Sequence, residues 1–72
     1  MNIRLWFIMD SDSGEARLFS KLPSSRNPGV EDRVWIPRSQ IERCQKQPVK
    51  PGEKWPEHHM TITDWIAEKK GL

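Results

Sequence analysis

Cationic side chains alternate with aromatic rings along the first half of this 72-residue sequence. If residues 2–9, 15–22 and 33–36 are β-strands, one side of these segments carries both kinds of side chain: Arg4, Trp6, Arg17, Phe19, Lys21, Arg33 and Trp35. Rings stack on nucleobases and cations meet phosphates, so this pattern is typical of surfaces that bind single-stranded nucleic acid. The predicted core side carries the apolar set Ile3, Leu5, Phe7, Ala16, Leu18, Val34 and Ile36.

The chain is mildly basic, with 12 Lys and Arg residues against 10 Asp and Glu residues and a net charge of +2. Residues 33–54 hold six cations and two carboxylates, a local charge of +4, whereas the segments on either side each have a net charge of −1. A basic stripe of this kind is the electrostatic footprint of a nucleic-acid contact. The candidate binding residues are Arg4, Trp6, Arg17, Arg33, Trp35, Arg38, Arg43, Lys46, Lys50 and Trp55.

The four Trp residues have a second interpretation, because a chain of this size needs large apolar side chains to build a core. We expect Trp35 and Trp65 to belong to that core, with the C-terminal helix covering it. Trp6 fits either interpretation. Trp55 stands between Lys54 and Pro56 in a polar stretch, so we expect it to face solvent or to clamp its loop onto the sheet.

Metal binding and catalysis find little support in the sequence. His58 and His59 are adjacent and would point to opposite sides of a strand, with no C-x-x-C or H-x-x-x-H spacing nearby. Cys44 lies near cations but has no base with an orienting carboxylate. The run D-S-D-S-G-E at 10–15 opens like a calcium loop, yet Lys21 stands where that loop needs its bidentate Glu. We therefore expect no metal, no cofactor and no enzymatic activity.

Length and composition narrow the class further. A chain of 72 residues is predicted to form one small domain over 1–72, too small to hold most catalytic pockets rigid. The longest apolar run, at 5–9, is too short for a membrane span or a signal peptide. A single Cys excludes a disulfide framework. The sequence therefore predicts a soluble protein of a reducing, intracellular compartment.

Local patterns give the expected elements. The alternating segments 2–9 and 15–22, joined by a Gly-containing turn, predict a β-hairpin. A third strand over 33–36 should end at Pro37, which has no N–H to donate. Residues 39–44 fit either one helical turn, opened by a Ser39–Glu42 capping box, or a strand.

The C-terminal third has the clearest signals. A short strand is expected at 60–63, followed by a helix over 64–70 with Thr63 as its N-cap. Gly71 suits the left-handed position that ends a helix, and the last residue would pack back in a Schellman motif. Long loops are predicted at 23–32 and 45–59. The expected fold is α+β and mostly β: an antiparallel sheet of about four strands, curled or barrel-like, with one short C-terminal helix.

Two segments carry a resemblance to known proteins. Val34–Glu42 contains W-I-P-R-S-Q, and Ile62–Leu72 contains W-I-A-E-K-K-G-L. In this order they resemble a group of small proteins of bacteriophages, prophages and other mobile elements, which share a W-[ILV]-P-[KR]-S-Q strand end and a W-[IL]-A-E-x-K-G-L helix. The resemblance implies a phage or mobile-element context, and hence the cytoplasm of a bacterial host, rather than a particular activity.

Two functions from different classes fit these observations. The first is a small basic binding module that contacts single-stranded nucleic acid through its aromatic and basic sheet face. The second is a phage-encoded inhibitor, of the anti-defence or anti-CRISPR kind, that binds a host protein complex through its loops and Trp55. A homo-oligomer, including one that sequesters nucleotides, stays open as a third form. None of these involves a membrane.

Overall fold

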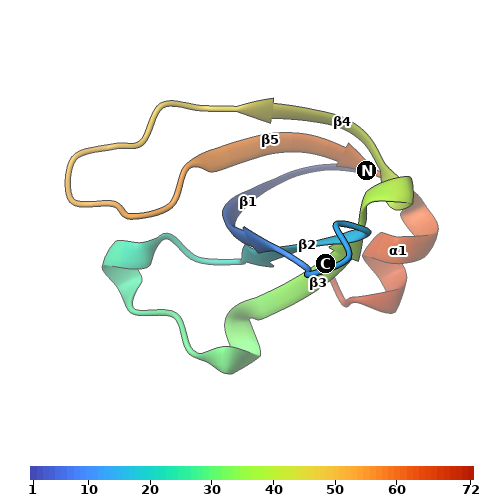
Figure 1. Cartoon of the computed structure of the whole chain (residues 1–72), viewed down its shortest axis with the longest axis horizontal. Helices are drawn as coiled ribbons and strands as arrows, with labels where there is room; N and C mark the ends of the chain where they lie inside the picture. Colours follow the sequence, from blue (N-terminus) through green and yellow to red (C-terminus); the bar gives the residue numbers. More distant parts are fainter.

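Strand β1 is the centre of the sheet, because it pairs with a different partner along each half of its length (Figure 1). In the computed structural model, which describes residues 1–72, five antiparallel strands lie in the order β3-β2-β1-β5-β4. Their bounds are β1 (Asn2–Asp10), β2 (Ala16–Ser20), β3 (Arg33–Pro37), β4 (Ile41–Lys46) and β5 (Glu57–Ile62). The predicted β1–β2 hairpin and the short third strand are confirmed.

The sheet is curled but open. Residues Asn2–Trp6 of β1 pair with β5, and Trp6–Asp10 pair with β2. The register shifts between Phe7 and Met9, and such a bulge bends a strand and increases its twist. Figure 1 shows β1 curving between β5 and β4 on one side and β2 and β3 on the other. The expectation of about four strands is one short, and a barrel is wrong, because the edge strands β3 and β4 do not pair.

The core lies inside the curl. Its buried members come from four strands and the helix: Leu5, Phe19, Val34, Ile36, Met60, Ile62, Ile66 and Ala67. Phe19, expected beside the cations, is 0% exposed and lies across from Phe7 and Val34. The predicted alternation of β2 is therefore wrong by one residue, which moves Arg17 to the interior side and Leu18 to the outer side. Leu18 and Phe19 are both large and apolar, so the pattern alone could not set the phase.

The C-terminal helix α1 (Asp64–Lys69) closes one end of the core through Ile66 and Ala67. The Thr63 hydroxyl accepts a hydrogen bond from the Ile66 N–H, so the predicted N-cap is confirmed. Gly71 takes φ 68°. The Leu72 N–H donates to the Ala67 carbonyl and the Gly71 N–H to that of Glu68, which is the predicted Schellman motif. Leu72 packs against the core.

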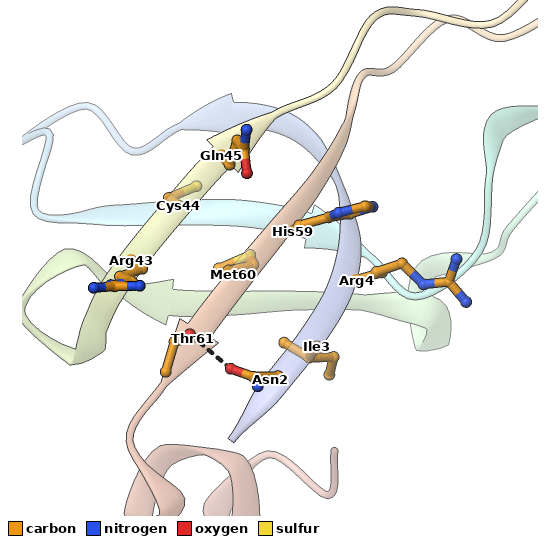
Figure 2. Close-up of a pocket in the computed structure, with 9 residues that line it drawn as sticks. All are labelled: Asn2, Ile3, Arg4, Arg43, Cys44, Gln45, His59, Met60 and Thr61. Carbon is orange, nitrogen blue, oxygen red and sulfur yellow. Dashed lines mark hydrogen bonds between the residues drawn. The ribbon is translucent and has the colours of Figure 1, made fainter.

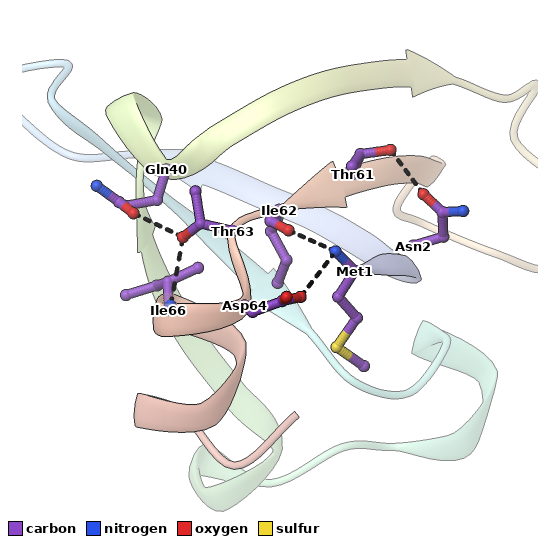
Figure 3. A network of polar contacts seen from close by, with 8 residues as sticks. All are labelled: Met1, Asn2, Gln40, Thr61, Ile62, Thr63, Asp64 and Ile66. Carbon is purple, nitrogen blue, oxygen red and sulfur yellow. Dashed lines mark hydrogen bonds and ion pairs between the residues drawn. The ribbon is translucent and has the colours of Figure 1, made fainter.

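The segment between β3 and β5 combines the two structures considered for it. A 3-10 turn, η3 (Arg38–Gln40), leads directly into β4. The Ser39–Glu42 capping box does not form, because the chain becomes extended at Ile41. Gln40 instead fastens this turn to the start of α1: its Oε1 accepts from the Thr63 hydroxyl, and its carbonyl accepts from the Thr63 N–H (Figure 3).

The two long loops lie at the opposite end of the molecule from α1 (Figure 1). The first contains two 3-10 turns, η1 (Ser24–Arg26) and η2 (Val30–Asp32). The second is shorter than expected, because β4 continues to Lys46 and β5 already begins at Glu57. None of the helices has the length and apolar character needed to span a membrane.

Candidate nucleic-acid interface

A groove of about 700 Å³ runs across the outer face of strands β1, β5 and β4. The strand register sets its side chains in two rows of three: Asn2, Thr61 and Arg43 in one, and Arg4, His59 and Gln45 in the other. Figure 2 shows Arg4 and Arg43 at opposite margins, with the two β5 residues between them. Ile3, Cys44 and Met60 complete the lining, and by alternation their side chains belong to the other face of the sheet.

The groove is electropositive. Its lining contains two Arg and one His but no Asp or Glu. Arg17 is the only Lys or Arg in the protein that forms an ion pair with a carboxylate, so Arg4 and Arg43 have no acidic partner. Both arginines are exposed. An exposed guanidinium without a carboxylate partner is free to bind an anion such as a phosphate.

Two of the polar side chains of the groove, Asn2 and Thr61, hold each other in place by a hydrogen bond. The Thr61 hydroxyl donates to the Asn2 Oδ1 at 2.7 Å, which leaves the Asn2 amide N–H groups free to donate outward (Figure 2). The His59 Nε2 lies 2.8 Å from the Glu57 Oε1. The groove therefore combines two cations with neutral donors, which is suited to an anionic ligand that crosses three strands.

A small cavity of about 90 Å³ adjoins the groove where the loops meet β1. It is lined by two indoles, two prolines and three charged residues: Trp6, Trp55, Pro23, Pro48, Lys50, Glu53 and Glu57. Trp6 lies across from Glu57. This pair is the next outward-facing pair after Arg4 and His59, since Trp6 is two positions after Arg4 in β1 and Glu57 is two positions before His59 in β5. The cavity is therefore a continuation of the groove on the same face of the sheet.

Glu53 links the two long loops, both of which line this cavity, by hydrogen bonds. Its carboxylate accepts from the Ser24 hydroxyl at 2.8 Å, the Ser25 hydroxyl at 2.6 Å and the Ser25 N–H at 3.1 Å. The Lys54 N–H donates back to the Ser24 hydroxyl at 2.7 Å. Hydrogen bonds from Ser25 and Ser24 lower the pKa of Glu53, because they stabilise the charged form.

The ten candidate residues do not form one surface. Arg4 and Arg43 line the groove, and Trp6, Lys50 and Trp55 line the adjoining cavity. Arg33 and Trp35 lie on the outer face of β3, and Arg38 in η3. Two others lie on the interior side. Arg17 pairs with Asp10 at 3.1 Å and stacks over the Phe7 ring at 4.9 Å, and Lys46 lies across from His58.

The tryptophans reverse the expected assignment. Trp35 is 40% and Trp65 is 59% exposed, so neither is a core residue. Lys69 places its ammonium 4.8 Å from the Trp65 ring centroid. Trp55 is half-buried in the lining of the cavity, in agreement with the alternative that it clamps its loop onto the sheet. Trp6 is half-buried in the same lining. The core instead uses Phe19 and aliphatic residues, and the loops rather than the helix cover Trp6.

Four groove residues were missed from the sequence: Asn2, Gln45, His59 and Thr61. A signal for two of them exists in β5. Residues 57–62 alternate, with His58, Met60 and Ile62 buried and the intervening residues facing outward. The predicted loop up to His59 is therefore too long, because a histidine at a buried position disguises the alternation of β5.

Away from α1 the inner side of the sheet is polar and carries the buried His58, the half-buried Arg17 and the exposed Cys44. Partial burial raises the pKa of the Cys44 thiol, an effect that the nearby Arg17 charge opposes. A raised pKa leaves less thiolate, and thus a weaker nucleophile. Burial lowers the pKa of His58, which is 5% exposed, and the Pro56 carbonyl partly offsets this. No three His, Cys, Asp or Glu side chains gather in a way that would hold a metal ion.

The electropositive groove and the adjoining cavity are thus the two built features of the surface. Of the residues expected to bind, they bring together Arg4, Arg43, Trp6, Lys50 and Trp55. Comparison of the chain with models of protein families, with curated proteins and with solved structures gives no match.

Proposed function

We propose that this protein is a small, basic, non-catalytic module that binds single-stranded nucleic acid across the outer face of β1, β5 and β4. The observation that carries the proposal is the groove, whose lining has two unpaired arginines and no carboxylate. In this proposal Arg4 and Arg43 contact phosphates at the two margins. Asn2, Gln45 and Thr61 supply hydrogen bonds between them.

The shape of the groove favours a chain over a compact ligand. It is open and crosses three strands, and side chains at its two margins carry the charge. The groove itself contains no Trp or Phe, so base stacking falls to Trp6 and Trp55 at its end. The resemblance of the W-I-P-R-S-Q and W-I-A-E-K-K-G-L segments to those of phage and mobile-element proteins favours a role in replication, recombination or repair in the cytoplasm of a bacterial host.

The test is the salt dependence of binding to a fluorescein-labelled oligo(dT), measured by fluorescence anisotropy. Each phosphate contact contributes a slope of about −0.7 to a plot of log K against log salt for single strands. The double variant Arg4→Ala/Arg43→Ala should bind more weakly and reduce the slope by about 1.4. Arg26→Ala is the matched control, because Arg26 is an exposed arginine on the first long loop with no ion pair.

Absence of binding to any single-stranded DNA or RNA at low salt would contradict the proposal. So would equal losses of affinity in the groove variant and in Arg26→Ala, since the attraction would then be a general property of a basic protein.

A second candidate function is the inhibitor that binds a host protein complex. Two observations favour it: Trp35 and Trp65 are exposed, and Glu53 holds the two long loops against each other. Exposed Trp residues are frequent anchors of protein interfaces. This function predicts a stoichiometric complex from a bacterial lysate that survives nuclease and moderate salt, and that Trp35→Ala/Trp65→Ala abolishes. Recovery of only nuclease-sensitive partners would rule it out.

A further inference from the structure

The register of β1 with β5 leads from the groove into the small cavity. The pairs Asn2 with Thr61, Arg4 with His59 and Trp6 with Glu57 follow one another on the outer face. Each pair is two residues, about 6.6 Å, beyond the last. A nucleic-acid strand that places a phosphate at Arg4 therefore has its next nucleotide at the mouth of the cavity.

Two indole side chains line the cavity. Trp6 and Trp55 both line it, and neither packs ring-against-ring with another aromatic side chain, since those contacts are confined to Phe7, Phe19 and His58. Pro23 and Pro48 add apolar surface. Flat, apolar walls of this kind accept a planar ring, and a volume of about 90 Å³ favours a small one.

Glu57 supplies the polar group of the cavity. Its side chain is 12% exposed, its Oε1 interacts with His59, and its Oε2 has no hydrogen-bond partner. Glu53, the other carboxylate, already accepts three hydrogen bonds from Ser24 and Ser25. No buried side-chain oxygen in the protein lacks a hydrogen-bond partner, so the free Glu57 oxygen reaches solvent and is available to accept a hydrogen bond from a ligand.

We propose that this cavity takes one nucleobase that carries an exocyclic amino group, with the ring against Trp6 and Trp55 and the amino group donating to Glu57. Cytosine is the smallest base that fits this description, and a carboxylate is a known acceptor for its amino group. Thymine and uracil present a carbonyl oxygen at the same position, which the carboxylate repels. This inference rests on the proposed function and adds base selectivity to it.

Two indoles with carboxylates would also suit an organic cation. The position of the cavity favours the base. It opens from a groove with two unpaired arginines, and Lys50 already places a cation at its lining. An approaching cation would meet repulsion from both, whereas a polyanion is drawn along the groove to the cavity.

The experiment compares fluorescein-labelled oligo(dC) and oligo(dT) by anisotropy at one salt concentration. A hydrogen bond to a charged group corresponds to about a tenfold preference for oligo(dC) in the unmodified protein. Glu57→Gln should remove the preference, because the amide offers both a donor and an acceptor. Glu15→Gln is the matched control: Glu15 is exposed in the β1–β2 turn, and its side chain makes no hydrogen bond in the structure. It should keep the preference.

A second measurement follows the cavity directly. In the double variant Trp35→Phe/Trp65→Phe only Trp6 and Trp55 remain, and oligo(dC) should quench their fluorescence. Binding of both oligonucleotides with equal affinity, or without quenching, would overturn the cavity assignment while the proposed function stands. No binding of either would remove both. Quenching by tetramethylammonium chloride, but not by sodium chloride at the same concentration, would make the cavity a cation site and overturn the inference.

Discussion

Phe7 of β1 and Phe19 of β2 lie directly across from each other, with ring centroids 5.8 Å apart and planes inclined at 63°. This edge-to-face pair fixes which side of the sheet is interior. Because side chains alternate along a strand, the inward position of Phe7 turns Trp6 outward, and Arg4 follows at the next outward position. The groove and the cavity therefore depend on a core contact that neither of them contains.

Replacement of Phe19 by Ala should cost about 3–5 kcal/mol in the free energy of unfolding, because it empties the best-buried aromatic position of the core. That is a large part of the total stability of so small a protein. Urea denaturation followed by circular dichroism measures it. Met9→Ala is the control, since Met9 is exposed, and it should change stability by about 0.5 kcal/mol or less. Similar losses in the two variants would contradict the central role of Phe19.

His58 should make the protein less stable below about pH 6.5. Burial lowers its pKa from an ordinary value of 6.5, and the charges of Arg17 and Lys46 act in the same direction. The unfolded chain therefore takes up a proton in a pH range where the folded protein does not. Stability is complete above the unfolded pKa and falls as the pH drops toward the folded one. Urea midpoints between pH 7.5 and 5 measure this, and His58→Gln should flatten the profile. An unchanged slope in that variant would assign the effect to another group.

Removal of the Glu53 carboxylate should loosen both long loops without unfolding the sheet. Glu53→Ala leaves Ser24 and Ser25 without their shared acceptor. Trypsin should then cut faster after Arg26 in the first loop and after Lys54 in the second, and amide exchange should rise in both loops together. Glu31→Ala is the comparison, because it removes an exposed carboxylate from the first loop that makes no hydrogen bond with the second. Faster exchange in only one loop would show that Glu53 does not join them.

Thr63→Ala should cost about 1 kcal/mol or somewhat more. Thr63 caps α1 through Ile66 and also donates to Gln40, so its hydroxyl joins the helix to the turn before β4 (Figure 3). Thr63→Ser keeps the hydroxyl and should retain most of the stability. Thermal unfolding of the two variants side by side separates the hydrogen bonds from the loss of the methyl group. Equal destabilisation in both would show that packing alone matters.

Local signals in the sequence were enough wherever the structure is decided locally. The cap at Thr63, the stop at Gly71 and the turn between β1 and β2 each depend on residues within a few positions, and each forms as expected. The predicted inward and outward positions of β2 were wrong, because contacts with other strands determine them. The phase of β2 follows from the partners of Phe19 in β1 and β3, and nothing within 16–20 distinguishes the two possibilities.

The site was half predictable for the same reason. Arg4 and Arg43 stand out as cations, but they line the same groove only because β5 lies between β1 and β4. His59 and Thr61 become groove residues through the same strand order. The alternation within β5 indicates that they face outward, but it does not indicate which strands lie beside β5. Trp35 and Trp65 stay exposed because smaller aliphatic side chains already fill the space within the curl.

The placement of β5 beside β1 also affects the rate at which the chain folds. The first strand of the chain keeps one edge free until residues 57–62 arrive, so its second ladder closes across most of the sequence. Contacts between residues so far apart in the sequence slow folding, because the chain loses conformational entropy in bringing them together before the contacts stabilise it. The β1–β2–β3 meander closes over shorter separations, through one tight turn and the first long loop. The groove is lined by β1, β5 and β4 and thus needs both ends of the sequence, so a chain truncated before β5 cannot display it.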